Sequence, residues 1–294
     1  MSNNQKWFAS TLGTKISVRH RTTFHYASPV THSVNTLHLE PRTFPCQKTM
    51  LALIRVLPAT RMRCFTDLFQ NITHHFELPQ AHSKLEIESR IKVHNLPLEV
   101  PEISREMTVA DYQDTAVRET VWAYLQESHW VSNYSEVWRQ AVDLTTGVTS
   151  VFEQAGIIME WIHSEFTYAT GVTSASTHLE EAFRLRCGVC QDFTHVMLGL
   201  CRAVGIPARY ASGYLYNGPR DSLVGAQASH AWAEVYLPGA GWIGFDPTNN
   251  NLADERYVKI AVGRDYEDVA PVRGSYSGTG QCRMEVSVEV SKAD

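Results

Sequence analysis

The sequence of 294 residues contains 26 Lys and Arg against 31 Asp and Glu, which gives a formal net charge of −5. It contains no basic block, and this argues against nucleic acid as the main partner, because binding to a phosphate backbone needs a clustered positive face. It also contains no run of about 18 apolar residues, so a membrane is not expected as a partner.

The N-terminal residues and the cysteines favour a reducing compartment. Residues 1–14 lack the apolar segment of a secretory signal and resemble a short, disordered extension. The six cysteines are too scattered to form a disulfide framework in a chain of this length. We therefore expect a cytoplasmic protein with reduced thiols.

Residues 15–98 have the pattern of an antiparallel, sandwich-like β domain. Over residues 85–93, apolar side chains alternate with charged ones, as in a half-buried strand. Residues 50–57 are apolar on both faces except at Arg55, which predicts a central buried strand. Histidines are frequent in this domain, but their spacings match no metal site, so no metal is predicted.

Prolines 97 and 101 mark the end of this domain, since proline interrupts both strands and helices. Residues 99–148 then have the pattern of a helical connector that packs on the following core. A capping-box pattern at Ser150 and Glu153 begins a helix that ends near Phe166. This helix is expected to pack against a second helix, which follows Cys190.

The segment 187–193, with the sequence Cys-Gly-Val-Cys-Gln-Asp-Phe, combines a turn glycine with the start of this second helix. Apolar side chains at helical spacing over 193–204 form one face of the helix, and Gly205 ends it. Cys190 therefore lies in the first turn, where unpaired backbone N–H groups and the helix dipole favour a thiolate. Asp192 is expected to stabilise the same helix start.

A strand, turn and returning strand follow over 228–237, 238–241 and 242–246. A turn centred near Gly239 brings His230 and Asp246 within about one diagonal step of each other across an antiparallel ladder. The sequence thus predicts a nucleophile at a helix start, a base on a strand, and a carboxylate that orients the base. This is the arrangement of cysteine enzymes that transfer acyl groups.

Several separated motifs in this half of the chain resemble the core of the bacterial transglutaminase-like superfamily. The superfamily includes candidate cysteine proteases with a papain-like Cys-His-Asp arrangement. The resemblance implies an α+β protein in which residues 149–294 form a papain-like, transglutaminase-like catalytic core. The nucleophile would lie at a helix N-terminus that packs on an antiparallel sheet. The motifs are Gly188–Phe193, Gly205–Arg209, Ser229–Trp232 and Gly244–Thr248.

The segment before residue 98 resembles, more loosely, the β-rich N-terminal region that often precedes this core. Three short motifs carry this resemblance, and they are Leu39–Arg42, Asp67–Asn71 and His82–Leu85.

The resulting hypothesis is attack by the Cys190 thiolate on an amide carbonyl of a peptide or protein, with His230 as proton carrier and Asp246 fixing its tautomer. The acyl-thioester that results reacts with water in a hydrolase and with an amine in a transglutaminase. The residues do not separate these outcomes, and analogy with bacterial relatives favours hydrolysis.

The oxyanion of this reaction needs hydrogen-bond donors. The backbone N–H of Cys190 is one candidate. Gln191, Tyr168 and Trp232 are further candidates for contacts with the substrate or the oxyanion.

A metal site, a regulatory disulfide and a binding module are alternatives to this hypothesis. Cys187 and Cys190 form a C-x-x-C pattern followed by His195 and Cys201, which suggests zinc. However, the helix turns His195 away from Cys190 and carries Cys201 about 16 Å along its axis, so no zinc or other cofactor is predicted. A regulatory Cys187–Cys190 disulfide and a non-catalytic binding module on the same fold remain alternatives. Substrate identity and oligomeric state are not predicted.

Overall fold

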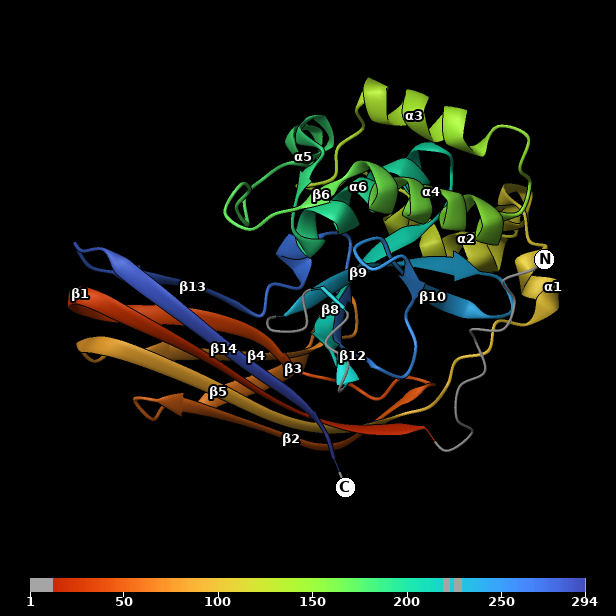
Figure 1. Cartoon of the computed structure of the whole chain (residues 1–294). Coiled ribbons are helices and arrows are strands. Elements are labelled where there is room, and N and C mark those ends of the chain that lie inside the picture. The colour runs from red at the N-terminus through yellow and green to blue at the C-terminus, as the bar shows by residue number, and fades with distance from the viewer. Residues whose placement is uncertain (1–12, 219–222, 225–228, 294) are drawn as a thin grey trace.

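The computed structural model describes residues 13–218, 223–224 and 229–293, and Figure 1 shows its two parts. A body of long strands forms one part. A smaller sheet covered by helices forms the other. Most of the predicted extension over 1–14 lies outside the described residues, and so does most of the loop that precedes His230.

The N-terminal part is an antiparallel seven-stranded sheet, as predicted, organised around one long strand, β1 (Thr14–Glu40). The first half of β1 pairs with β5 (His82–Asn95) and β14 (Cys282–Lys292). Its second half pairs with β4 (Ile72–Leu78) and β13 (Val272–Ser277). The remaining strands, β2 (Gln47–Leu57) and β3 (Met62–Thr66), lie beside β5 and β4.

The prediction for β2 is wrong in one respect. The apolar run over residues 50–57 predicts a central buried strand, but β2 lies at the edge of the sheet and, among the described strands, pairs only with β5. Met50 and Leu53 on this strand are 53% and 56% exposed. A run of apolar residues indicates a strand, but it does not reveal whether a second layer covers the strand.

The end of the chain also differs from the expectation. A strand over residues 283–290 was predicted within the 149–294 core, and the strand is present as β14. However, β13 and β14 cross back and pair with β1 of the N-terminal sheet. Alternation identifies a strand with two unlike faces, but its pairing partner is a non-local choice that the pattern does not contain.

The core contains a five-stranded antiparallel sheet with helices on one face (Figure 1). Apolar side chains of both layers form the main hydrophobic core. In spatial order the strands are β11 (Asn251–Leu252), β10 (Gly241–Asp246), β9 (His230–Leu237), β8 (Ala208–Leu215) and β12 (Tyr257–Gly263). The helices of the core are α4 (Val151–Glu165), α5 (Leu179–Leu185) and α6 (Cys190–Ala203).

The helical connector contributes to the same core, as expected, because Val137 and Ala141 are buried in it. The Ser150 side chain caps α4 by accepting a hydrogen bond from the Glu153 amide at 3.2 Å, which confirms the predicted helix start. The connector contains α1 (Glu102–Arg105), α2 (Thr115–Val121), α3 (Ser135–Thr145) and the 3₁₀ turns η1 (Val109–Gln113) and η2 (Trp122–Tyr124). No helix in the described ranges is long and apolar enough to cross a membrane.

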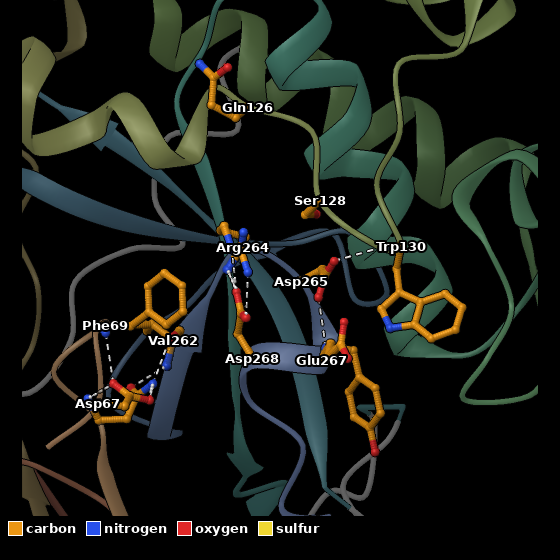
Figure 2. A network of polar contacts seen from close by, with 12 residues as sticks. Asp67, Phe69, Gln126, Ser128, Trp130, Val262, Arg264, Asp265, Glu267 and Asp268 are labelled. Atoms are coloured by element: carbon orange, nitrogen blue, oxygen red, sulfur yellow. Dashed lines mark hydrogen bonds and ion pairs between the residues drawn. The ribbon is translucent and has the colours of Figure 1, made fainter. Parts of the chain in front are cut away.

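A polar network around the end of β12 joins the two parts of the protein (Figure 2). The Asn71 side chain makes two hydrogen bonds of 2.8 Å with the backbone of Val262, one as donor and one as acceptor. Asp67 holds Asn71 in place through a further side-chain bond of 2.9 Å. Asp265, just after β12, accepts a hydrogen bond from the Trp130 amide of the connector. The N-terminal sheet and the connector therefore fix the strand that, as shown below, contributes Tyr257 to the site.

Candidate active site

Cys190 is the first residue of α6, as predicted, and its side chain is 9% exposed. The strand before it, β7 (Cys187–Gly188), pairs in parallel with β6 (Thr167–Tyr168), and this short ladder holds the turn that leads to Cys190. Gly188 has no space for a side chain, because an added Cβ would overlap the Asp192 carboxylate. The close approach of these two residues explains the glycine.

Asp192 stabilises the start of α6, as expected. Its Oδ2 atom accepts hydrogen bonds from the Val189 amide at 2.8 Å and from the Thr173 hydroxyl at 2.6 Å. Burial raises the pKa of this carboxyl, and the hydrogen bonds from Thr173 and Val189 oppose that shift. The carboxylate thus holds the turn next to Cys190.

The β9–β10 ladder brings His230 and Asp246 together. Ala233 pairs with Phe245, and this register leaves His230 one diagonal step from Asp246, as predicted. His230 Nε2 lies 2.7 Å from Asp246 Oδ2, and both side chains are inaccessible to solvent. A dry pair at this distance is a strong charge-assisted hydrogen bond.

Further donors surround the Asp246 carboxylate. Its Oδ2 atom also accepts hydrogen bonds from the Tyr257 hydroxyl and from the side-chain amide of Asn249, both at 2.8 Å. Its Oδ1 atom accepts from the Thr248 backbone amide at 2.9 Å. Burial raises the pKa of Asp246, but the charge of His230 and the hydrogen bonds from His230, Asn249 and Tyr257 outweigh burial and lower it, so the group is ionised at neutral pH.

The ionised Asp246 controls the charge of His230. Burial by itself lowers the pKa of the imidazole, but the Asp246 charge, the hydrogen bond to it and the nearby Cys190 thiol together raise it to about 10. His230 Nδ1 has no partner of ordinary hydrogen-bond geometry within the described residues, which leaves this nitrogen available on the side of Cys190. Because its pKa is raised to about 10, the His230 ring is an imidazolium at neutral pH.

The candidates for contacts with the substrate or the oxyanion differ in what their side chains contact. Tyr168 is half-buried on β6 against Phe193, with ring centroids 6.2 Å apart, and burial together with the charge of Cys190 raises its pKa to about 12. The Gln191 side chain donates to the Ala175 carbonyl oxygen at 3.1 Å. Trp232 is 1% exposed and stacks on His230 with a centroid separation of 6.2 Å.

The residues of the C-x-x-C pattern and those that follow it do not converge. His195 lies on another face of α6, where its Nε2 accepts a hydrogen bond from the Tyr266 amide at 3.2 Å. Cys201 is fully buried, and burial raises its pKa to about 12. All six cysteines are free thiols, including the half-buried Cys187.

Sequence reasoning missed Tyr257, Asn249 and Thr173. Asn249 follows Asp246 by three residues, so the turn after β10 contained a local signal for it. Tyr257 and Thr173 reach the site from other elements, and nothing near them in the sequence indicated this.

Comparisons with known proteins agree with this architecture. Residues 139–247 match the transglutaminase-like superfamily, and residues 16–94 match the bacterial transglutaminase-like N-terminal region. The chain is 34% identical over 284 residues to the uncharacterized protein ML0607 of Mycobacterium leprae, which covers 95% of this chain and 99% of that protein.

Two further similarities differ in extent. Over 111 residues the chain is 34% identical to a protein-glutamine gamma-glutamyltransferase of Pseudomonas aeruginosa, covering 35% of this chain and 16% of that protein. The fold is similar to that of a candidate cysteine protease from Cytophaga hutchinsonii, with a TM-score of 0.78 and 22% identity over 96% of this chain and 91% of that one. The chain therefore belongs to the transglutaminase-like superfamily and contains the bacterial transglutaminase-like N-terminal region.

Proposed function

We propose that this protein is a cysteine-dependent amide hydrolase in which Cys190 attacks the carbonyl carbon of a peptide or protein substrate. The observation that carries the proposal is the solvent-inaccessible His230–Asp246 pair at 2.7 Å, with the second ring nitrogen on the side of Cys190. An imidazolium beside a thiol at a helix N-terminus favours the thiolate, which is the nucleophilic form.

In the first half of the reaction, the Cys190 sulfur forms a bond to the carbonyl carbon, and the carbonyl oxygen becomes an oxyanion. The Cys190 backbone N–H is a candidate donor to that oxyanion, and the phenol of Tyr168, kept neutral by its raised pKa, is a second one. His230 then gives its Nδ1 proton to the leaving amine as the carbon–nitrogen bond breaks. An acyl-thioester remains on Cys190.

In the second half, His230 takes a proton from a water molecule that attacks the thioester carbon. The carboxylic acid leaves, and Cys190 returns to the thiolate. Asp246 stays ionised throughout, holds the ring orientation and stabilises the imidazolium. Trp232, which is buried against the ring, supports that orientation rather than contacting a large substrate.

A reducing compartment such as the cytoplasm would keep Cys190 competent, since the attack requires a free thiol. The free state of all six cysteines supports this part of the proposal.

The test is incubation of the wild type and of Cys190→Ala with a peptide library, with and without a primary amine donor. We expect cleavage by the wild type in both conditions and no cleavage by Cys190→Ala. Cys201→Ala is the matched control, because it removes a thiol from the same helix at a position away from the helix start. Cleavage by Cys190→Ala at the wild-type rate would rule out the proposed nucleophile.

Acyl transfer to an amine is the second candidate function. The local similarity to a protein-glutamine gamma-glutamyltransferase motivates it. The amine arm of the same experiment separates the two outcomes: cross-linked or amine-labelled glutamine without cleavage would assign the protein to acyl transfer.

A non-catalytic or redox-regulated binding module is the candidate from another class. Alkylation with iodoacetamide at mildly acidic pH, followed by mass spectrometry, tests it. Preferential labelling of Cys190 supports the enzyme, whereas slow and equal labelling of all six cysteines supports the module. Loss of the Cys190 label under mild oxidation, restored by a reductant, would assign a regulatory disulfide with Cys187.

A further inference from the structure

A cavity of about 360 Å³ lies between the N-terminal sheet and the face of the core sheet opposite its helices. None of Cys190, His230 and Asp246 lines it. Its size is within the range of pockets that bind small organic molecules. The N-terminal side provides Arg42, residues 44–47, Asn95, Leu96 and Leu98, and the core side provides Trp232, Trp242 and their neighbours.

The walls of this cavity are largely apolar and aromatic. Phe44 and Leu96 line it from the N-terminal domain, and Trp242 lines it from β10. Leu96 is 45% exposed, so it lies towards the open side. Such walls favour a ligand with an apolar body.

Three cations and one carboxylate among the residues that line the cavity lie close together. The buried Glu234 carboxylate contacts both Arg209, at 2.7 Å, and Lys259, at 2.6 Å. Arg42 is a third cation in this group, and it makes no ion pair within the described ranges. Burial and the charge of Arg209 lower the pKa of Arg42, and the charges of Glu234 and Asp67 oppose this shift. The guanidinium donates one hydrogen bond, to the Gln70 carbonyl oxygen at 3.2 Å. Two further acidic residues, Asp254 and Glu255, also line the cavity. Asp254 forms an ion pair with Arg256 at 2.6 Å.

Two buried polar atoms of residues that line the cavity lack hydrogen-bond partners within the described part of the chain. Trp232 Nε1 is a donor, and Asn95 Oδ1 is an acceptor. These residues are 1% and 2% exposed. An added Cβ on Gly244, which also lines the cavity, would lie 3.1 Å from Trp232 Nε1, so the indole N–H lies at this wall. An unpaired buried polar group destabilises the folded protein, and a ligand with matching groups removes that cost.

We propose that this cavity is a binding site for a small N-acylated amino acid. The free carboxylate of such a ligand would pair with Arg42, and its apolar side chain or acyl group would occupy the aromatic walls. Its amide has one acceptor and one donor, which complement Trp232 Nε1 and Asn95 Oδ1. This inference does not depend on the hydrolase proposal, because no member of the proposed triad lines the cavity.

Two residues that line the cavity also contact residues of the candidate active site. Trp232 stacks on His230, and Tyr257 donates a hydrogen bond to Asp246. A ligand in the cavity therefore contacts the residues that support the His230–Asp246 pair.

The probe is hippurate (N-benzoylglycine), titrated into the full chain by calorimetry. Its neutral analogue, N-benzoylglycinamide, is the comparison ligand. We expect hippurate to bind one site and the neutral analogue to bind at least tenfold more weakly. Arg42→Gln should reduce hippurate affinity by about tenfold to a hundredfold, as for loss of a hydrogen bond to a charged group. Arg63→Gln, with the same charge change at an exposed position on β3, should bind as the wild type does.

A second pair of measurements locates the ligand. Leu96→Trp, at the open side of the cavity, should weaken binding without lowering the melting temperature of the free protein. Alkylation of Cys190 should leave hippurate affinity unchanged. Absence of binding to the wild type, equal affinity in Arg42→Gln, or loss of binding on alkylation of Cys190 would each overturn the assignment.

The same titration distinguishes a free N-acylated amino acid from the C-terminal end of a peptide. An N-acetylated tripeptide with a free C-terminal carboxylate shares the amide and carboxylate but is larger. Affinity equal to that of hippurate would assign the site to peptide ends and overturn the assignment to free N-acylated amino acids, whereas at least tenfold weaker binding supports it.

Discussion

The phenol of Tyr257 donates a hydrogen bond of 2.8 Å to Asp246 Oδ2, the oxygen that also accepts from His230. Tyr257 comes from β12, which pairs with β8 and not with either strand of the hairpin that carries His230 and Asp246. The carboxylate is therefore held from outside its own hairpin, and this contact leads to the first prediction.

Tyr257→Phe should lower the rate of amide hydrolysis by roughly twofold to tenfold, since one hydrogen bond that holds the carboxylate in position contributes roughly 0.5–1.5 kcal/mol. Loss of this donor leaves Asp246 more basic, so the pKa of His230 should rise further. The alkaline limb of the pH–rate profile should therefore move to higher pH. A limb that moves to lower pH would contradict the proposed role of the phenol.

Asp246→Asn should lower the rate of hydrolysis more than Tyr257→Phe does, and it should move the alkaline limb of the pH–rate profile in the opposite direction. The neutral amide removes the charge that holds the pKa of His230 near 10, so the pKa should fall towards or below its ordinary value. We expect a rate loss on the order of 100-fold to 10,000-fold and an alkaline limb at lower pH. Single-turnover hydrolysis across pH 5 to about 10.5 measures both, and an unchanged profile would exclude Asp246 as the orienting group.

Gly188→Ala tests the turn before Cys190. The added methyl group would overlap the Asp192 carboxylate, which caps the start of α6. We expect a loss of roughly 1–3 kcal/mol in the free energy of unfolding, together with slower alkylation of Cys190.

The matched control for this substitution is Gly156→Ala in α4. An added Cβ at Gly156 has no neighbour within 4 Å, so alanine should be neutral or stabilise the helix by up to about 1 kcal/mol. Equal effects of the two substitutions in urea unfolding would show that the close approach of Gly188 and Asp192 is not important.

Glu88→Gln tests a buried ion cluster in the N-terminal sheet. The Glu88 carboxylate is 3% exposed and contacts Arg19 and Arg21 at 2.8 Å each, and also Arg90. Burial raises the pKa of this carboxyl, but the three arginines outweigh burial and lower it to about 2. A lowered pKa stabilises the folded state above the unfolded value of 4.5, and this contribution disappears as pH falls through about 2.

The substitution should therefore reduce the free energy of unfolding by about 2 kcal/mol at pH 7, and the difference from the wild type should shrink between pH 4.5 and 2. Glu102→Gln, at a side chain that is 85% exposed, is the control and should change stability little. A constant difference across this pH range would contradict the assignment.

The sequence alone determined the features that depend on residues close together in the chain. Helix spacing and Gly188 located Cys190 at the start of α6, and the position of the turn after β9 predicted the step between His230 and Asp246. Both follow from fixed repeats of the backbone, which a single sequence contains.

Tertiary structure alone decided which distant segments meet. The alternation in β14 predicted a strand but not its pairing with β1, and the apolar run of β2 did not reveal that one of its faces is open. The approach of Tyr257 to Asp246, and the cavity between Arg42 and Trp242, depend on how two sheets dock. Such contacts join residues far apart in the chain, and the side-chain pattern of one segment contains no information about the segment that covers it.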